Sequence, residues 1–562
     1  MVKDEILDSL KKALTLIKAP STEVELQLPT VASYGDYTTN VAMKLAKDLK
    51  KNPVEIADMI VKQFPKTSLI KKITVVKPGF INFEVDDNYF YMNSLKLLDK
   101  VEYLPHHLGS EKKIMVEFAH PNTHKLFHIG HLRNISTGES IVRILEASGN
   151  KIVRSNYQGD VGLHIAKCLY GIKKEAAKMK GLKNLQEKIE FIGKMYSKGT
   201  KAYEDDPTAK VEILTINKMI YDQSPEIMPL WTETRQWSLD YYNEVYKRVY
   251  SHFDRLYFES ELPKRGMEIV SEALKKGILE KSQGAIVFNG KKCGLDTRVF
   301  VNSLGFPTYE GKEPALAEKE FADFGLLDKC IHVVTPEQTS FFKVTFKVEE
   351  LLDEKKYKNK QYHLIYEWVK LKEGKMSSRE GNIIEGNWLI DETKKKILKN
   401  FKCDEATAEI LAIASVKYSF LKNSTQTIIH FDIDESIATD GNSAPYLIYT
   451  YVRSQSILRK EPMPDMTSSK NNCVFNDDEN KLLRTLYQYQ EIVKKAAVEL
   501  SPNVIANYLY ELASQFNLFY QKNPILKAEG DIKKQRLLIT ALTAKIIKEG
   551  LYLLGIKTVE KM

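Results

Sequence analysis

Residues 114–134, which read IMVEFAHPNTHKLFHIGHLRN, decide the fold. The run begins with five apolar or nearly apolar residues, which predict a buried strand. A polar loop follows, and a helix is expected from near His131 to Gly149. The segment KIVRSNY (151–157) comes directly afterwards and predicts a second strand. A strand, a helix and a strand joined by short connections form a βαβ unit, which implies a parallel sheet.

The rest of the chain adds further modules to this unit. The stretch KKITVVKPGFINFEV (71–85) combines β-rich alternation with a Pro-Gly turn, and strand signals return at 331–335 and 362–371. Helical periodicity dominates after 391. We therefore expect an α/β protein with three domains: an α/β module at 1–100, a Rossmann-type parallel-sheet domain at 111–390 with a helical insertion at about 173–260, and an all-α bundle at 391–562.

The composition excludes several classes of protein. Of 562 residues, 43% are hydrophobic and 28% are charged, which is typical of a folded domain and not of a disordered chain. No stretch reaches the roughly 18 apolar residues of a membrane span, and the acidic residues near the N-terminus fit neither a secretory signal nor a transit peptide. We expect a cytoplasmic protein with no membrane partner. Five cysteines without a CxxC pair make a disulfide framework or a cysteine-rich zinc site improbable.

Four histidines fall within twelve residues: His120, His124, His128 and His131. A metal cluster and a polyanion site are the two specific alternatives. No cysteine lies nearby and no HExxH motif is present, so we expect no metal. His128-Ile-Gly130-His131 instead lies where a loop enters a helix, and helix N-termini attract phosphate. Gly130 leaves the backbone open to a ligand, and two imidazoles can donate hydrogen bonds to phosphoryl oxygens.

Two other segments carry many cationic residues. In Lys372–Asn382 (KEGKMSSREGN in full), a lysine, two serines and an arginine follow a predicted strand, which would suit a loop that closes over pyrophosphate. By itself this segment would be an ordinary surface loop. Residues 173–201 contain nine lysines against three glutamates. They form either a solvated helical insertion or a contact with nucleic acid, and the net charge of +9 allows both.

Taken together, an HxGH motif at the first βα turn and a KMSxx loop after a late strand resemble the paired signature of class I aminoacyl-tRNA synthetases. Further segments narrow the resemblance to the arginyl-tRNA synthetase family, and they run along the whole chain: SYGDYTTNVAMKLAK (33–47), PGFINFEV (78–85), VEFAHPNTHKLFHIGHLRN (116–134), VRSNYQGDVGLHI (153–165), YEWVKLKEGKMSSREGN (366–382), GNSAPYLIYTYVRSQSI (441–457) and LLGIKTVEKM (553–562).

The resemblance implies a Rossmann-type domain that forms arginyl-adenylate from ATP and arginine and passes arginine to the 3′ end of tRNA. The implied catalytic residues are those of the two motifs together with an upstream lysine: His128, Gly130, His131, Lys375, Ser377 and Lys125. Ser378 stands where many class I enzymes have a second lysine. Lys125 matches a family lysine that assists such a loop, although a solvated loop lysine is the alternative.

A guanidinium offers five donors in a rigid fork, so arginine recognition calls for carboxylates and planar acceptors. The resemblance assigns this role to Glu117, Asn122, Tyr309, Glu313 and Gln338. The sequence around Glu313 departs from the family pattern, and a surface turn is its structural alternative. For Gln338 the alternative is a structural hydrogen bond.

The resemblance also implies contacts with tRNA. Phe80 and Asn82 match residues of the N-terminal module that meet the D-loop corner, where an aromatic ring can stack on a base. Tyr446, Tyr449 and Arg453 share one helix face and match a platform for anticodon bases. Core packing is the alternative for Phe80 and for the helix face.

The expected ligands are therefore L-arginine, ATP with Mg²⁺, and tRNA(Arg), and we expect a monomer without a structural metal. Two other functions remain open at this point. The chain could be another class I synthetase, although the spacing between its two motifs leaves little room for an editing domain and no zinc-ligand set is visible. It could also be a non-catalytic RNA-binding homologue.

Overall fold

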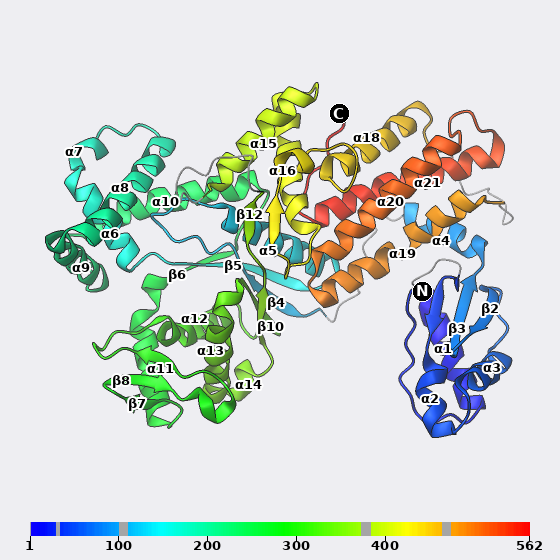
Figure 1. The fold of residues 1–562 in the computed structure, drawn as a ribbon, viewed down its shortest axis with the longest axis horizontal. Coiled ribbons are helices and arrows are strands. Elements are labelled where there is room, and N and C mark those ends of the chain that lie inside the picture. Colours follow the sequence, from blue (N-terminus) through cyan, green and yellow to red (C-terminus); the bar gives the residue numbers. More distant parts are fainter. Residues whose placement is uncertain (1, 30–33, 100–110, 373–383, 464–473) are drawn as a thin grey trace. The chain divides into compact units, whose positions relative to one another are not determined.

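The computed structural model describes residues 2–29, 34–99, 111–372, 384–463 and 474–562. The chain forms two compact units, and each contains segments that are far apart in the sequence (Figure 1). Unit 1 consists of residues 1–103, 454–489 and 514–546. Unit 2 consists of residues 104–453, 490–513 and 547–562.

The N-terminal part of unit 1 is an α/β module. Its sheet is antiparallel in the order β1-β3-β2, and the Pro-Gly turn joins β2 to β3 as the sequence predicts. Apolar side chains of β3, including Ile81 and Phe83, form its core. The elements of this module are α1 (Val2–Leu16), β1 (Tyr37–Thr39), α2 (Val41–Leu49), α3 (Pro53–Gln63), β2 (Ile70–Val76), β3 (Phe80–Val85) and α4 (Asp87–Asp99).

Asp36 links this module to a helix of the C-terminal part within unit 1. Its Oδ1 pairs with Arg484 of α19 (Asp477–Glu499) at 2.8 Å, and its Oδ2 accepts a hydrogen bond from the backbone N–H of Val85 at 2.7 Å. Arg484 also pairs with Asp87 at 2.5 Å. Asp36 belongs to the SYGDY segment, so this part of the motif stabilises unit 1.

Unit 2 is built around a five-stranded parallel sheet, which confirms the predicted Rossmann-type fold class (Figure 1). All neighbouring pairs in the order β11-β10-β4-β5-β6 are parallel. The strands are β4 (Lys113–Glu117), β5 (Lys151–Gln158), β6 (Arg255–Phe258), β10 (Lys329–Val334) and β11 (Gln361–Ile365). Helix α5 (Ile129–Ala147) contacts β4, β5 and β10, as expected for the crossover of a βαβ unit.

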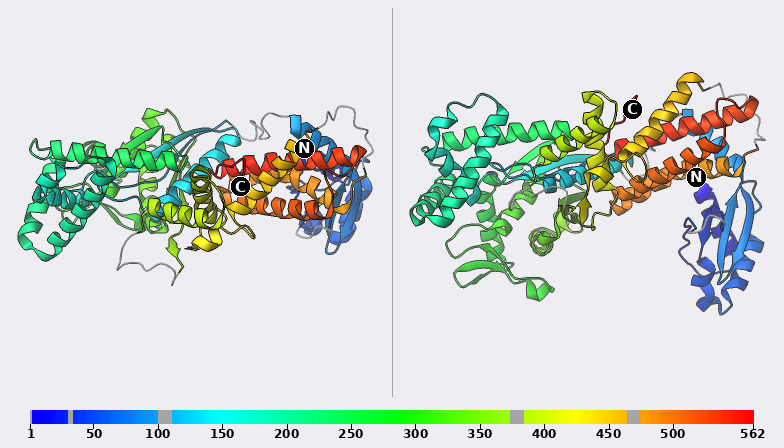
Figure 2. Two further views of the ribbon diagram at one scale, coloured as in Figure 1. Left: turned by 90° about the horizontal axis from the view of Figure 1, so that it is seen from above. Right: turned by 45° about the horizontal axis from the view of Figure 1, so that its top comes forward.

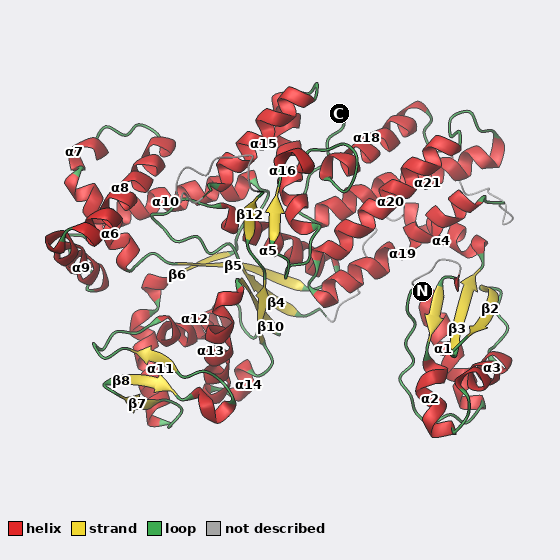
Figure 3. Cartoon of the chain, in the orientation of Figure 1, coloured by secondary structure: helices red, strands yellow, loops and turns green. Residues whose placement is uncertain are grey.

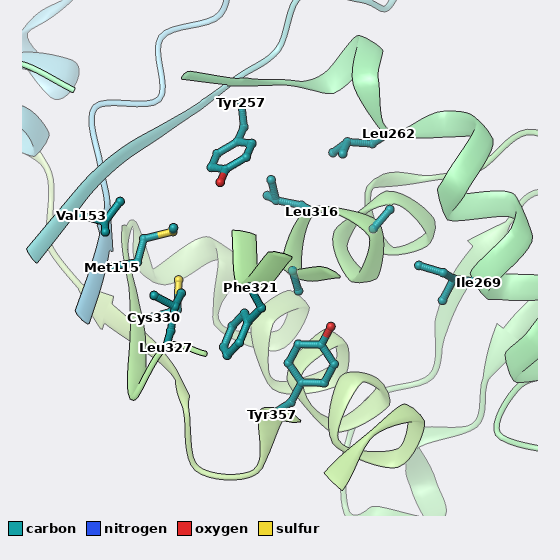
Figure 4. Close-up of a cluster of buried hydrophobic side chains, with 12 residues drawn as sticks. Met115, Val153, Tyr257, Leu262, Ile269, Leu316, Phe321, Leu327, Cys330 and Tyr357 are labelled. Carbon is teal, nitrogen blue, oxygen red and sulfur yellow. The ribbon is translucent and has the colours of Figure 1, made fainter. Parts of the chain in front are cut away.

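Helix α12 (Tyr309–Asp323) packs on the sheet through an apolar core (Figure 4). Met115, Val153 and Cys330 come from three adjacent strands and meet Leu316 and Phe321 of α12. The same cluster contains Tyr257 of β6 and Tyr357 of α14 (Glu354–Tyr357). This packing places the polar residues of α12 beside the sheet, where they matter for the site described below.

Two insertions interrupt the parallel sheet. The first is helical and follows β5; it lies at one end of unit 2 in every view (Figures 1 and 2). Its helices are α6 (Leu163–Lys174), α7 (Ala176–Met179), α8 (Leu185–Asp205), α9 (Pro207–Tyr221) and α10 (Met228–Arg248). It therefore begins about ten residues before the expected residue 173 and ends before β6.

The second insertion was not predicted from the sequence. It follows β6 and contains a small antiparallel sheet in the order β7-β8-β9 beside helices (Figure 3). Its elements are α11 (Pro263–Lys275), β7 (Glu280–Ser282), β8 (Ala285–Phe288) and β9 (Arg298–Val301). Helix α13 (Thr339–Leu352) then follows β10.

The expectation of one strand at 362–371 is wrong in its second half. β11 ends at Ile365, and Val369–Leu371 forms a separate strand, β12, that pairs with β13 (Ile429–Phe431). The buried side chain of Arg133 in α5 accounts for this break, because it donates hydrogen bonds to the carbonyls of Trp368 (2.9 Å) and Thr427 (2.9 Å). The chain thus leaves the sheet to provide acceptors for a buried cation.

The C-terminal part is helical, as predicted, apart from β13 among its described residues (Figure 3). Its helices are α15 (Gly386–Asn400), α16 (Glu405–Leu421), α17 (Ile433–Ser436), α18 (Ala444–Lys460), α19, α20 (Pro502–Lys522) and α21 (Gly530–Leu553). Within the described residues, we find no helix with the length and hydrophobicity to cross a membrane.

Candidate active site

The loop after β4 enters α5 through a pair of histidines. His128 is the N-cap of α5, and its Nδ1 accepts hydrogen bonds from the backbone N–H groups of Gly130 (3.1 Å) and His131 (3.3 Å). In return, Nδ1 of His131 accepts a hydrogen bond from the backbone N–H of His128 (3.2 Å). The two rings stack with their centroids 3.6 Å apart. This reciprocal capping fixes both rings at the helix N-terminus.

Both imidazoles are neutral with the proton on Nε2, because each Nδ1 is an acceptor. Burial, assisted by the charge of Lys125, lowers the pKa of His128 to about 4. Burial and the neighbouring His128 lower the pKa of His131 well below its usual value. Each ring therefore keeps one N–H donor at neutral pH. Two such donors at the positive end of a helix are suited to phosphoryl oxygens.

Gly130 is required by this arrangement for a reason that the sequence did not show. A Cβ atom at position 130 would lie 2.9 Å from Cε1 and 3.0 Å from Nδ1 of His128. Such contacts are shorter than van der Waals distance, so a larger residue would displace the imidazole. The glycine thus protects the position of the His128 ring, in addition to any access it gives to the backbone.

The other two histidines of the cluster lie apart from this pair. His124 is fully buried, and its ring contacts the hydroxyl groups of Thr234 (2.7 Å) and Thr123 (3.1 Å). Burial lowers its pKa to about 3, so it remains neutral. His120 has its Nδ1 3.3 Å from the carbonyl of Tyr157, whereas its buried Nε2 has no partner. Among the described residues, the four histidines do not converge as a metal site would require.

Lys125 and Asn122 are held firmly in the loop. The hydroxyl of Tyr242 donates hydrogen bonds to the backbone carbonyls of both residues, at 2.7 and 2.6 Å. Burial lowers the pKa of Lys125, whose Nζ lies 5.5 Å from the ring centre of Tyr196. Lys125 is therefore partly buried. Asn122 Oδ1 accepts a hydrogen bond from the backbone N–H of Gly159 (3.2 Å), which leaves its NH₂ group as a donor.

Lys375 and Ser377 lie outside the described residues, but the segment that follows them is anchored at the histidine turn. The backbone N–H of Ile129 donates to the carbonyl of Ile384 (2.9 Å), and that of Gly386 donates to the carbonyl of Phe127 (2.7 Å). The side chain of Glu385 accepts a hydrogen bond from Tyr241 (2.9 Å). The chain that leaves the second motif is thus joined directly to the first.

Beside this turn, one face of the sheet carries an acidic pocket formed with α12 and α13. Glu117 ends β4 and is 2% exposed, and Glu313 of α12 is 6% exposed. Burial raises the pKa of Glu313 to about 8, and the charge of Glu117 acts in the same direction. Glu313 is thus a buried helix residue and not a surface turn. Two further buried carboxyl groups, those of Glu320 and Glu349, have raised pKa values because of burial.

The remaining arginine candidates lie around the same edge. Tyr157 of β5 is within electrostatic reach of the pocket, since burial and then the charges of Glu259, Glu313, Glu117 and Tyr309 raise its pKa well above the usual value. Tyr309 begins α12 with its side chain exposed, and Gln338 ends a short 3-10 helix that follows the carboxyl end of β10. The structure therefore brings Glu117, Glu313 and Tyr309 to one region and places Gln338 at the same end of the sheet.

The tRNA candidates are placed differently in the two units. In unit 1, Phe80 is half-buried and Asn82 is 3% exposed, with both on β3. In unit 2, Tyr449 is 40% exposed on α18, and the Arg453 guanidinium lies 4.6 Å from its ring centre. Tyr446 packs against Tyr510, with centroids 5.7 Å apart. The aromatic and cationic surface thus consists of Tyr449 and Arg453.

Sequence reasoning missed several polar residues of the pocket: Tyr157, Glu320, His332, Glu349 and Gln361. His332 offered a signal, because it is the one ionisable residue within the apolar segment IHVVT. The helical carboxylates gave none, since Glu320 and Glu349 lie in charged stretches that read as solvent-exposed.

Family comparisons cover nearly the entire chain. Residues 1–85 match the arginyl tRNA synthetase N terminal domain, residues 94–433 match the catalytic domain of class I tRNA synthetases (R), and residues 447–562 match the DALR anticodon binding domain.

Individual proteins give the same result. The chain is 33% identical over 553 residues to the arginine–tRNA ligase of Fusobacterium nucleatum, covering 96% of this chain and 95% of that one. It is also 33% identical to the arginine–tRNA ligase of Bdellovibrio bacteriovorus, over 92% and 91% of the two chains. Among solved structures, the arginyl-tRNA synthetase of Thermus thermophilus has a TM-score of 0.84 at 22% identity over both entire chains. That of Plasmodium falciparum has a TM-score of 0.83 at 20% identity, over 100% and 99% of the two chains. The two structures support the fold.

Proposed function

This chain belongs to the arginyl-tRNA synthetase family, and from that premise we propose that it is an arginine–tRNA ligase that works through the residues described above. Its first step joins the carboxylate of L-arginine to the α-phosphorus of ATP and releases pyrophosphate. In its second step, a ribose hydroxyl at the 3′ end of tRNA(Arg) displaces AMP. The observation that carries the proposal is a buried acidic pocket beside a helix N-terminus that carries two Nε2–H donors.

We assign the phosphate groups of ATP to the turn formed by His128, Gly130 and His131. The two imidazoles would donate hydrogen bonds to phosphoryl oxygens as negative charge develops there. Their neutral state suits this role, since neither ring has to lose a proton first. Lys375 and Ser377 would bind the leaving pyrophosphate, and Lys125 would add positive charge from the other side of the turn.

We assign the guanidinium of arginine to Glu117 and Glu313, whose buried carboxyl groups require a cationic partner. Asn122 has a free NH₂ donor for the carboxylate of the substrate, and Tyr309 and Gln338 would close the rim of the pocket. Glu320 and Glu349 add to the negative character of the pocket, although burial favours their protonated forms.

Class I synthetases use ATP as a substrate, and we propose that Mg²⁺ arrives with it. His128 and His131 are nitrogen donors and do not suit Mg²⁺, so the ion would be held mainly by phosphate oxygens of ATP. We further propose that the enzyme is a cytoplasmic monomer. Size-exclusion chromatography with light scattering tests its oligomeric state.

For tRNA, we propose that Tyr449 and Arg453 stack on anticodon bases, with Tyr446 supporting the helix from the core side. Phe80 and Asn82 would contact the tRNA from the N-terminal module. Because Asn82 is almost fully buried, its contact requires Phe80 or a neighbouring loop to move first.

The decisive experiment is arginine-dependent ATP–pyrophosphate exchange, with and without tRNA(Arg), against a panel of other amino acids. The proposal expects exchange with arginine and not with lysine or citrulline. Exchange with another amino acid would indicate a different class I synthetase. If exchange were absent with every amino acid while tRNA still bound, the chain would be a non-catalytic RNA-binding homologue.

A further inference from the structure

A hydrogen-bonded chain of buried side chains runs across the parallel sheet to Glu117. His332 of β10 lies opposite Glu117 in the register of the two strands, and their side chains are on the same face of the sheet. His332 Nδ1 is 3.0 Å from Glu117 Oε1, and His332 Nε2 is 3.0 Å from Gln361 Oε1. Gln361 in turn donates a hydrogen bond from Nε2 to Glu349 Oε2 (2.8 Å). His332 is 1% exposed, so water does not compete for these contacts.

The direction of these hydrogen bonds determines the protonation of His332. Because the amide nitrogen of Gln361 faces Glu349, its oxygen faces His332, and Nε2 of His332 must carry a proton. The carboxylate of Glu117 is an acceptor, so Nδ1 must carry a proton as well. Contacts with Cys330 and Glu117 outweigh the opposing effect of burial and raise the pKa of His332 well above its usual value. His332 is therefore an imidazolium that forms an ion pair with Glu117.

The ion pair leaves half of the Glu117 carboxylate available. Oε1 is bound by His332, whereas Oε2 is buried and has no hydrogen-bond partner. A buried carboxylate oxygen without a donor is costly, which points to a donor supplied by a ligand. The imidazole itself is held between the strand and the rings of Phe342 and Phe346, at centroid distances of 5.1 and 5.4 Å.

We propose that His332 is a positioning residue for arginine recognition: it orients Glu117 through Nδ1–H so that Glu117 Oε2 accepts a hydrogen bond from the substrate guanidinium. Gln361 and Glu349 hold the opposite side of the imidazole. The inference rests on the proposed function, because it needs arginine as the ligand of the acidic pocket. It adds a residue that acts through Glu117 and does not itself touch the substrate.

The same histidine also belongs to the one group of potential metal ligands among the described residues. Ligand atoms of Glu320, Cys330 and His332 lie within 4.8 Å of one another. Both ring nitrogens of His332 are already hydrogen-bonded, and burial raises the pKa of the Cys330 thiol, which keeps it protonated. A metal would have to break this network, so we favour the hydrogen-bonded arrangement and treat metal binding as a contrary outcome.

Two substitutions separate the orienting hydrogen bond from the loss of charge. In His332→Asn the side-chain amide occupies the position of Nδ1 and can still donate to Glu117. In His332→Gln the amide occupies the position of Nε2 and cannot. Both variants lose the positive charge equally, so any difference between them reports on the contact with Glu117.

The experiment measures KM for arginine, KM for ATP and kcat in tRNA-dependent ATP–pyrophosphate exchange. We expect KM for arginine to be about tenfold higher in His332→Gln than in His332→Asn, as is usual for the loss of a hydrogen bond to a charged group, with little difference in KM for ATP or in kcat. In a Glu117→Gln background the difference between the two variants should disappear. Equal KM values for arginine in the two variants would overturn the proposal.

Three further measurements keep the result interpretable. Thermal unfolding of each variant shows whether the protein folds, and Gln361→Met, which removes the distal anchor only, should raise KM for arginine less than His332→Gln does. If both His332 variants fail to fold, an unchanged KM in Gln361→Met contradicts the positioning role. One equivalent of tightly bound metal in the purified protein would assign His332 to a metal site instead. Wild-type enzyme without arginine-dependent exchange would refute the proposed function, which is a separate outcome.

Discussion

The acidic pocket predicts that arginine binding depends on pH through Glu313. Burial, followed by the charges of nearby carboxylates, raises the pKa of this side chain to about 8, whereas the guanidinium requires its ionised form. Below pH 8 the empty enzyme therefore holds a proton that arginine must expel. The affinity for arginine should increase as the pH rises towards 8 and then level off.

The size of the effect follows from the ionised fraction. With a pKa of about 8, roughly 3% of Glu313 is ionised at pH 6.5 and roughly 76% at pH 8.5, so the apparent Kd for arginine should fall about 25-fold between these values. At pH 7 binding should release about 0.9 proton per arginine. Isothermal titration calorimetry in buffers with different ionisation enthalpies measures both quantities.

Matched variants identify the group responsible. Glu313→Gln should weaken arginine binding and remove most of the proton release, since an amide cannot ionise. Glu349→Gln is the control: burial also raises the pKa of Glu349 to about 8, but its carboxyl group is bound to Gln361 and is not assigned to the substrate. Because arginine itself titrates identically with every variant, its own ionisation cancels. Proton release that persists in Glu313→Gln, or that disappears in Glu349→Gln, would refute this reasoning.

Four other substitutions test the remaining parts of the molecule. His128→Asn retains an N-cap but lacks the Nε2–H donor, so it should unfold near the wild-type temperature while exchange falls about 100-fold; His128→Ala should show the same loss plus about 1 kcal/mol of destabilisation. Gly130→Ala should lower kcat for exchange about tenfold or more at nearly unchanged arginine affinity, because its Cβ displaces the imidazole of His128. Tyr449→Ala should raise KM for tRNA about tenfold and leave tRNA affinity of the Arg453→Lys comparison variant closer to wild type, as filter binding can measure. Lys417→Met should cost about 2–4 kcal/mol in chemical denaturation, because it leaves two backbone carbonyls without the buried amine that now donates to both at 2.9 and 2.6 Å.

The βαβ unit could be predicted because its signals are local. The apolar run before the loop, the helix after His128 and the following strand each depend on residues that are close together in the sequence. The small sheet β7-β8-β9 escaped prediction because its strands are only three or four residues long and pair with one another across turns. The break after β11 escaped it as well, since Arg133 is about 235 residues away from the carbonyl of Trp368 that it binds.

For the candidate site, local pattern and family resemblance placed the histidine turn and the two carboxylates Glu117 and Glu313. They could not supply the protonation states, which depend on burial and on neighbours from other strands. His332 shows why: in sequence it is a single polar residue in an apolar strand, and only the register of β10 against β4 places it beside Glu117.

That register has a consequence for the charge of the pocket. Because the imidazolium of His332 neutralises Glu117, the ion pair contributes no net charge, and Glu117 serves arginine mainly as a fixed acceptor. The negative charge that balances the guanidinium must then come from Glu313, which ionises when the substrate enters. Geometry and charge are thus provided by different carboxylates. It follows that Glu117→Gln should reduce selectivity for arginine over its neutral analogue citrulline less than Glu313→Gln does, and competition between the two amino acids in the exchange assay would show whether this division holds.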